Sequence, residues 1–279
     1  MNKKVVLITG ASSGMGKEAA LLLARRGFKV YAGTRDPLGA DELLSECNKE
    51  QLDISVIGLN VCDTGSINDA IKQIEEEDNK IDVLVNNAGY GFVSTVEDAT
   101  EEEMISQFDV NVFGVLRVCK AVIPFMRKEN HGVIINISSF LGKIGLPLLT
   151  FYNSSKYAVE GITDSLRYEL DDFNIRVHSI MPGFFNTKFA RENLVTNLET
   201  FEKNSPYFAM ASGLAPRIVN EINSGNDPIL AAQLILEIIN DEKFPARATV
   251  GDKAKKFIPM RKELSDEDFE RRVKEYYNL

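Results

Sequence analysis

Short apolar runs rich in β-branched residues recur along the chain and alternate with longer stretches of helical periodicity. The runs cover residues 5–8, 29–32, 54–59, 83–85, 133–137, 175–180 and, more weakly, 248–250. Alternation of this kind is typical of a parallel sheet with helices on both faces. The first four runs are the most apolar, and we expect them to be buried on both sides. The pattern predicts a doubly wound, Rossmann-type α/β fold with about seven parallel strands.

Helix boundaries follow from residues that favour helix ends and from the spacing of apolar residues. One helix is predicted over residues 14–26, where Gly27 supplies a C-terminal stop. A second begins after Asp63, whose carboxylate is a suitable N-cap. A third and longer helix is expected over residues 152–170.

Nothing in the sequence marks a domain boundary. No internal repeat, low-complexity tract or Pro- and Ser-rich linker interrupts the chain, so we expect one domain over residues 1–279. Residues 188–227 look irregular and form either a mobile substrate lid or a plain surface excursion. The C-terminal extension, residues 252–279, is highly charged beyond Pro259 and is expected to form a peripheral helix.

Charge and composition exclude several classes of protein. The net charge of -9, without a basic cluster, disfavours binding to nucleic acid or to an anionic membrane surface. The apolar run near the N-terminus, residues 5–8, is shorter than the roughly 7–15 residues of a signal peptide, and no stretch approaches the about 18 of a membrane helix. We therefore expect no membrane insertion.

The cysteines and histidines predict neither a disulfide framework nor a metal site. Cys47, Cys62 and Cys119 are an odd set without CxxC spacing, and the chain has only two histidines. We expect free thiols, no metal and a cytoplasmic location.

The first predicted strand leads directly into a glycine-rich turn, and a helical pattern follows it. In the stretch Thr-Gly-Ala-Ser-Ser-Gly-Met-Gly, Gly10 permits a tight turn, Gly14 lets the backbone approach a pyrophosphate, and Gly16 permits close packing of helix on strand. The helix N-terminus offers its amides to the phosphates. A dinucleotide site is therefore predicted, with contacts from Gly10, Ser12, Ser13, Gly14, Met15 and Gly16.

The end of the second predicted strand bears on the choice between NAD and NADP. A carboxylate there accepts from the ribose 2′-hydroxyl of NAD, whereas the 2′-phosphate of NADP requires a cation. Thr34 stands where the carboxylate would be, and Arg35 beside it can form a fork with phosphate. This favours NADP(H) over NAD(H). Alternatively, Arg35 stacks on the adenine or faces water, neutralised by Asp36.

The helix over residues 152–170 opens with the motif Tyr-Asn-Ser-Ser-Lys. Tyr152 and Lys156 stand on the same helix face, and an adjacent ammonium lowers the pKa of a phenol from its ordinary value of about 10. Alone, such a pair is typical of a solvated surface. Ser139 changes the interpretation, because it follows the run 133–137 and ligands bind beyond the carboxyl ends of strands. Tyr152 is then a candidate general acid or base, and Ser139 can polarise the substrate oxygen.

These motifs resemble the short-chain dehydrogenase/reductase family, whose glycine loop is one residue wider than the general Gly-x-Gly-x-x-Gly form. Further family motifs follow in order: an Asn-Asn-Ala-Gly turn at residues 86–89, Asn111 in the next helix, and Pro182-Gly183 with Thr187 after the sixth run. The resemblance covers residues 4–251. The long tail and the stretch 87–92 are similar to members that act on steroids, retinoids or fatty acyl ketones.

The resemblance implies a role for each matched residue. Ser139, Tyr152 and Lys156 correspond to the catalytic triad, Asn111 holds a water in the proton relay, and Lys156 also binds the nicotinamide ribose. The implied cofactor contacts further along the chain are Thr34, Arg35, Asn60, Val61, Asn87, Ala88, Gly89, Tyr152, Lys156, Pro182, Gly183 and Thr187. Asn60 departs from the family pattern, which has Asp there, but its amide oxygen can still accept from the adenine amine.

The resemblance implies an oxidoreductase that transfers a hydride between the nicotinamide and a hydrophobic alcohol or ketone. Apolar residues after the predicted strands are expected to line the substrate pocket, although about half of them could belong to the core. They are Phe92, Phe140, Leu141, Leu146, Phe184, Phe185 and Phe189. The family also suggests a homodimer or homotetramer, formed through the helices that begin near Thr100 and Tyr152. The alternative function is a dinucleotide-binding sensor or regulator that has lost turnover.

Overall fold

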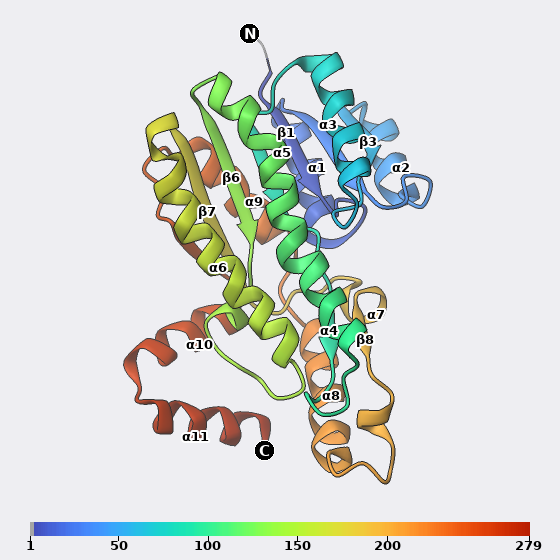
Figure 1. Cartoon of the computed structure of the whole chain (residues 1–279), viewed down its shortest axis with the longest axis vertical. Coiled ribbons are helices and arrows are strands. Elements are labelled where there is room, and N and C mark those ends of the chain that lie inside the picture. Colours follow the sequence, from blue (N-terminus) through green and yellow to red (C-terminus); the bar gives the residue numbers. More distant parts are fainter. Residues whose placement is uncertain (1–2) are drawn as a thin grey trace.

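A seven-stranded parallel sheet forms the centre of the protein in the computed structural model, which describes residues 3–279 (Figure 1). The strands are β1 (Val5–Thr9), β2 (Lys29–Thr34), β3 (Ile54–Gly58), β4 (Val83–Asn86), β6 (Gly132–Ile137), β7 (Ile175–Pro182) and β9 (Arg247–Val250). Their order is β3-β2-β1-β4-β6-β7-β9. The sheet therefore grows from β1 outward to β3, and the chain then crosses back to add β4 on the other side of β1. All seven predicted runs are confirmed as strands, and the described residues form a single Rossmann-type domain.

Helices cover both faces of this sheet. Alternate residues of β1 point to opposite sides, Val6 and Ile8 toward one core and Val5 and Leu7 toward the other. The first core is covered by α1 (Gly14–Arg25), α2 (Asp41–Glu50) and α9 (Ile229–Asn240), and the second by α3 (Thr64–Asp78), α5 (Gly114–Lys128) and α6 (Thr150–Leu170). The three predicted helices are confirmed with small shifts at their ends, and Asp63 caps α3 by accepting from Gly65 N.

The strand β3 departs from the expectation of burial on both sides. Ile54, Ser55 and Val56 are only partly buried, whereas every residue of β1 and β4 is buried. The reason is the position of β3 at the edge of the sheet, which run hydrophobicity cannot reveal.

A third layer lies beyond the carboxyl ends of the strands, at the lower end of the molecule in Figure 1. It contains β5 (Gly91–Val93), α4 (Glu101–Phe108), α7 (Phe189–Glu192), β8 (Leu194–Thr196), α8 (Phe208–Asn223), α10 (Asp252–Glu263) and α11 (Asp266–Tyr277). β5 and β8 form a separate two-stranded parallel sheet. Much of this layer packs around a third apolar core.

Two predictions for this layer were wrong. The segment 188–227 is not irregular throughout, because it contains the 16-residue helix α8. The helix expected beyond Pro259 is present as α11, but it is not peripheral, because it buries Phe269, Val273 and Tyr277; Pro259 itself lies inside α10. Within the described residues, no helix combines the length and the apolar character that a membrane span requires.

Candidate active site

The carboxyl ends of β1, β2, β4 and β6 open onto a cleft of about 770 Å³. Most of the residues predicted from the sequence line it. They are Gly10, Ser12, Ser13, Gly14, Met15, Thr34, Arg35, Asn60, Val61, Asn87, Ala88, Gly89, Tyr152, Lys156 and Thr187. Ser139, Pro182 and Gly183 line an adjoining apolar pocket, whereas Gly16 and Asn111 line neither and lie behind the surface.

The glycine loop has no room for a side chain at Gly10 or Gly16. Gly10 has φ +63°, and a Cβ there would lie 2.8 Å from Ala88 Cα. A Cβ at Gly16 would lie 2.5 Å from both Gly10 O and Asn87 Nδ2. The start of α1 is thereby held against the end of β1, and the loop backbone is left facing the cleft.

Asn87 and Thr9 join the glycine loop to the end of β4. The Asn87 side-chain amide donates to Thr9 O at 3.0 Å and to Gly10 O at 2.8 Å. In return, the backbone amides of Asn87 and Ala88 donate to Thr9 Oγ1, each at 3.0 Å. The sequence analysis did not assign Thr9 a role; a polar residue at the end of an otherwise apolar strand was the available signal.

Arg35 is exposed at the rim of the cleft. Among residues 3–279, no side chain or carbonyl group forms an ion pair or hydrogen bond with its guanidinium group. The neighbouring Asp36 turns its Oδ1 to Leu38 N at 3.1 Å and does not pair with Arg35. A cation is therefore available at the end of β2, and Thr34 beside it is neutral and buried.

Asn60 is partly engaged by its own turn. Its Oδ1 accepts from Cys62 N at 3.1 Å, and its backbone amide donates to Ser66 Oγ at 3.0 Å. The carbonyl oxygen has a second lone pair, so it can still accept a further hydrogen bond.

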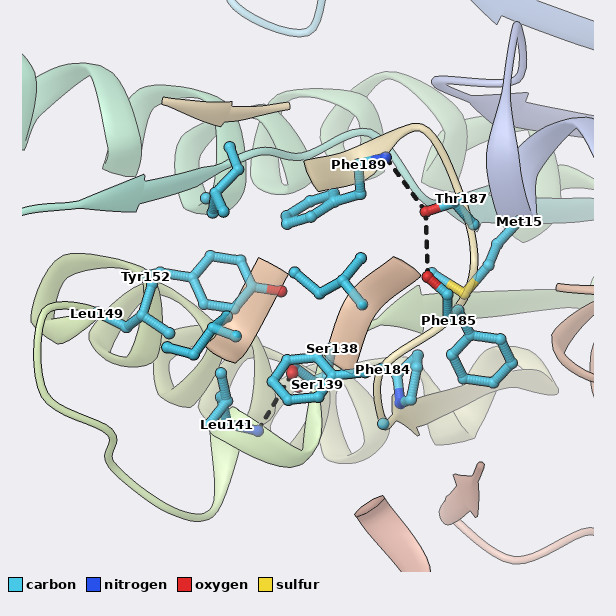
Figure 2. Close-up of a pocket in the computed structure, with 16 residues that line it drawn as sticks. Met15, Ser138, Ser139, Leu141, Leu149, Tyr152, Phe184, Phe185, Thr187 and Phe189 are labelled. Atoms are coloured by element: carbon cyan, nitrogen blue, oxygen red, sulfur yellow. Dashed lines mark hydrogen bonds between the residues drawn. The ribbon is translucent and has the colours of Figure 1, made fainter. Parts of the chain in front are cut away.

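The first turns of α6 hold Tyr152 and Lys156 side by side. Lys156 Nζ lies 5.7 Å from the centre of the Tyr152 ring and donates to Ile137 O at 2.9 Å. Figure 2 shows the Tyr152 phenol oxygen pointing into the apolar pocket, which Ser139 also lines. Ser139 Oγ accepts from Leu141 N at 3.1 Å, which fixes the turn at the end of β6. The three residues of the predicted triad are thus close together.

Burial controls the acidity of both α6 groups. Desolvation raises the pKa of Tyr152 to about 12, although the nearby Ser139 hydroxyl lowers it. Desolvation also lowers the pKa of Lys156 to about 8, against the opposing effect of the Glu160 carboxylate. The expected lowering of the phenol pKa by Lys156 is therefore wrong for the chain by itself, because desolvation of the Tyr152 hydroxyl has the largest effect on its pKa.

Asn111 lies behind the cleft in a π-helical turn, Asp109–Phe113, between α4 and α5. Its Nδ2 donates to Tyr90 O at 2.9 Å and to Ser155 Oγ at 3.0 Å, and its Oδ1 accepts from Tyr90 N at 3.1 Å. Ser155 Oγ in turn donates to Tyr152 O at 2.7 Å. Asn111 therefore ties the turn after β4 to α6, and Ser155 is a further link that the sequence analysis missed.

The apolar pocket adjoins the cleft and shares Met15, Ser138, Tyr152, Thr187 and Phe189 with it. Of the seven predicted pocket residues, Leu141, Phe184, Phe185 and Phe189 line it, as Figure 2 shows. Phe92 instead lines the cleft, and Phe140 and Leu146 are buried in the core. The lining residues that were not predicted are Gly91, Ser138, Leu149, Leu194, Ile218 and Ile222.

The loop between β7 and α7 joins the two cavities. Gly183 N donates to Val250 O at 2.8 Å, which extends the pairing of β7 with β9. Thr187 Oγ1 donates to Phe185 O at 3.5 Å and accepts from Phe189 N at 3.3 Å (Figure 2). Thr187 therefore lies opposite the glycine loop, where its side chain is 3.3 Å from the Cβ position of Gly14.

Known proteins share both this architecture and much of the sequence. The family model described as short chain dehydrogenase matches residues 4–197. The 3-ketodihydrosphingosine reductase of Bacteroides thetaiotaomicron is 38% identical over 251 residues, which are 90% of this chain and 89% of that protein.

Two solved structures extend the comparison. A short-chain dehydrogenase from Streptomyces avermitilis is 30% identical, with a TM-score of 0.83 over 100% of this chain and 97% of the other. Actinorhodin polyketide ketoreductase, solved with NADPH, is 27% identical, with a TM-score of 0.75 over 89% of this chain and 95% of the other. The chain belongs to the short-chain dehydrogenase/reductase family of oxidoreductases.

Proposed function

We propose that this protein transfers a hydride between NADP(H) and an alcohol or ketone on an apolar carbon skeleton. One observation carries the proposal: Tyr152 and Ser139 lie where a cleft large enough for a dinucleotide meets an apolar pocket. A substrate oxygen placed at this junction is within reach of both hydroxyl groups. The NADPH-bound ketoreductase with the same fold supports the choice of cofactor type.

The cleft residues fit such a cofactor. Residues of the glycine loop line the cleft, where their backbone amides can bind phosphate, and a Cβ at Gly89 would lie 3.1 Å from Asn111 Oδ1, so a side chain there would require Asn111 to shift. We assign phosphate binding to residues 10–16 and nicotinamide binding to Pro182, Gly183 and Thr187. When bound, the cofactor supplies the hydride.

The protein's own residues would handle the proton. The raised pKa keeps Tyr152 protonated at neutral pH, so it can donate a proton to the oxygen of a ketone as that carbonyl is reduced. Ser139 orients and polarises the oxygen. Lys156, held at Ile137 O, stabilises the phenolate that remains, and the hydrogen bonds of Asn111 keep the proton path in place.

Replacing Tyr152 with Phe tests the reaction. With NADPH and a panel of ketones that includes 3-ketodihydrosphingosine, kcat is expected to fall at least about 100-fold, while the NADPH dissociation constant stays unchanged. The matched control is Tyr168→Phe, on the same helix but exposed, which should retain activity. If wild-type protein binds NADPH but no ketone or alcohol supports turnover, a sensor replaces the proposed enzyme.

The unpaired Arg35 supports NADP(H) over NAD(H). Arg35→Ala is expected to raise the NADPH dissociation constant about 10- to 100-fold and to leave that of NADH unchanged, because only NADPH carries the 2′-phosphate. Arg26→Ala, at an exposed position after α1, is the control. Equal affinity of the wild-type protein for both cofactors would contradict the assignment.

The apolar pocket lining supports a hydrophobic substrate, as does similarity to a protein named as a ketodihydrosphingosine reductase. Within one domain over residues 1–279, we assign the substrate lid to residues 188–227, which contribute Phe189, Leu194 and the wall formed by α8. The free cysteines Cys47, Cys62 and Cys119 support a reducing, cytoplasmic location.

A homodimer or homotetramer is proposed through α4, α5 and α6. The supporting observation is a set of exposed apolar side chains on this side of the molecule: Ile105, Phe113, Leu116 and Tyr157. Light scattering of the purified protein tests the assembly, and a monomeric mass at micromolar concentration would contradict it.

A further inference from the structure

Helix α8 has two neighbouring faces with different contacts. Ile218 and Ile222 point into the apolar pocket and are 2% and 4% exposed. Arg217 and Glu221, each one position earlier on the helix, contact the C-terminal helices instead. Whatever fixes the second face therefore fixes the pocket wall.

Glu221 is the centre of the contacts on the second face. Its carboxylate accepts from Lys253 Nζ of α10 at 2.8 Å, from Tyr276 OH of α11 at 2.8 Å and from Tyr277 OH at 3.5 Å. Lys253 also contacts Tyr276 OH. The side chains of Glu221 and Lys253 are only 14% and 21% exposed, so water weakens this pair less than it would a surface pair.

Arg217 attaches α11 to α8 a second time. Its guanidinium donates to Tyr276 O at 2.7 Å and lies 5.9 Å from the centre of the Tyr276 ring. The backbone and the side chain of Tyr276 are thus both bound to α8. Because these contacts lie one helical turn apart, they fix the rotation of α8 as well as its position.

A row of aromatic rings connects α11 with the other side of the pocket. The Tyr277 ring stacks on Phe257 at 6.3 Å, Phe257 lies 6.2 Å from Phe140, and Phe140 meets Phe184 edge-on at 5.2 Å. Phe184 lines the pocket, and Phe140 directly follows Ser139. Two walls of the pocket therefore rest on the same C-terminal helix.

These contacts reach the apolar pocket and not the larger cleft, and their one approach to a proposed nicotinamide residue is the packing of Lys253 against Gly183. No residue of α8, α10 or α11, all within the described part of the chain, lines the larger cleft. A disturbance at Tyr276 is therefore expected to reach the substrate and to leave cofactor binding unchanged.

The geometry points to α11 as a specificity-determining element, in which Tyr276 and Glu221 are positioning residues that hold Ile218 and Ile222 in place as the wall against which the apolar chain of the substrate packs. This inference rests on the proposed function, because it requires that the pocket receive an apolar ketone.

The test uses two variants that preserve the size of the side chain, Tyr276→Phe and Glu221→Gln. Each is compared with a matched substitution at an exposed site, Tyr168→Phe on α6 and Glu270→Gln on α11. A series of unbranched methyl ketones of increasing length is reduced with NADPH. In both variants KM for the long ketones should rise about five- to tenfold, the effect of losing one or more partly buried hydrogen bonds. The kcat for the shortest ketone and the NADPH dissociation constant should match the controls.

Two further measurements separate positioning from general stability. Ile222→Ala removes part of the wall itself and should move the preferred ketone length upward by about two methylene groups. Hydrogen exchange of the amides in residues 208–223 should be faster in Tyr276→Phe and Glu221→Gln than in the controls, without any substrate present.

The possible failures are distinguishable. If wild-type protein reduces the ketones but the variants keep its KM values and length profile, the inference is wrong and the proposed function stands. If NADPH affinity falls in proportion to ketone affinity, the network supports the whole fold and the inference is again wrong. If wild-type protein reduces no ketone, the proposed function fails and the inference fails with it.

Discussion

Lys156 makes an unfavourable contribution to folding that its removal should reveal. Its side chain is buried, and desolvation lowers its pKa from 10.5 to about 8. Because each tenfold change in a protonation equilibrium is worth about 1.4 kcal/mol, burying the ammonium costs about 3 kcal/mol at pH 7. The hydrogen bond from Nζ to Ile137 O offsets about 1–2 kcal/mol of this cost. Lys156→Met is therefore expected to raise the free energy of unfolding by about 1–2 kcal/mol at pH 7 while abolishing turnover.

The lowered pKa of Lys156 also determines how the stability of the wild-type protein changes with pH. Between pH 8 and 10.5 the unfolded chain binds the lysine proton and the folded chain has lost it, so wild-type stability rises with pH across this range. The penalty is complete below about pH 8 and absent above about pH 10.5. The advantage of Lys156→Met over wild type should therefore shrink by about 3 kcal/mol across this range and change sign at about pH 9, near the middle of the range.

Urea unfolding at several pH values between 7 and 10.5 measures this difference directly. Lys120→Met, at an exposed position on α5, is the control and should show a difference from wild type that does not vary with pH. A Lys156→Met protein that is less stable than wild type at pH 7, or whose difference from wild type is constant with pH, would refute the argument.

Two further predictions concern the glycine loop. Gly16→Ala places a Cβ 2.5 Å from Gly10 O and should lower the free energy of unfolding by at least about 2 kcal/mol, measured by thermal unfolding. The control is Gly161→Ala on α6, where a Cβ meets nothing within 4 Å and should stabilise the protein by about 0.5–1 kcal/mol. Equal effects of the two substitutions would contradict the packing argument. Asn87→Ala removes the side-chain amide that donates to Thr9 O and Gly10 O, and it should raise the NADPH dissociation constant about tenfold in a fluorescence titration. An unchanged dissociation constant would show that the glycine loop keeps its conformation without Asn87.

The central sheet was predictable because its signals are local. Each apolar run carries its own β-branched composition, and features such as Gly27 and Asp63 end or begin helices through contacts within a few residues. The order of strands in the sheet is not a local property. Burial of β3 was therefore overestimated, because its position at the edge depends on where the other strands pair.

Helix α8 was missed for a different reason. Its buried residues Ala211, Leu214, Ile218 and Ile222 repeat at helical spacing, so a signal existed. Gly213 and Pro216 lie within the same stretch and are typical of helix ends, so the stretch was predicted to be irregular. Pro216 is tolerated in the interior of α8 only because tertiary packing outweighs its low propensity.

In the candidate site, too, the local features were predictable and the non-local ones were not. The glycine loop, Ser139, Tyr152 and Lys156 were found because residue spacing alone brings each group to a strand end or to one helix face. The acidity of the pair could not be found in this way, because it depends on how much water surrounds the groups. Residue spacing indicates that a phenol and an ammonium are neighbours. It does not indicate that both are buried, and burial determines the direction of both pKa changes.

The cofactor cleft and the substrate pocket are held together by different kinds of contact, and this has a consequence for specificity. The cofactor cleft is built at the ends of parallel strands, where neighbouring backbone segments are fixed by the hydrogen bonds of the sheet. The substrate pocket is enclosed by segments far apart in the sequence, such as the turn after β6 and helix α8. Side chains hold these segments in place, as Glu221 and Tyr276 do between α8 and α11. A substitution among those side chains can change the pocket without disturbing the sheet. The same framework can therefore keep the cleft and the position of Tyr152 while the shape of the pocket changes, which is why substrate identity is the property that the sequence motifs specify least.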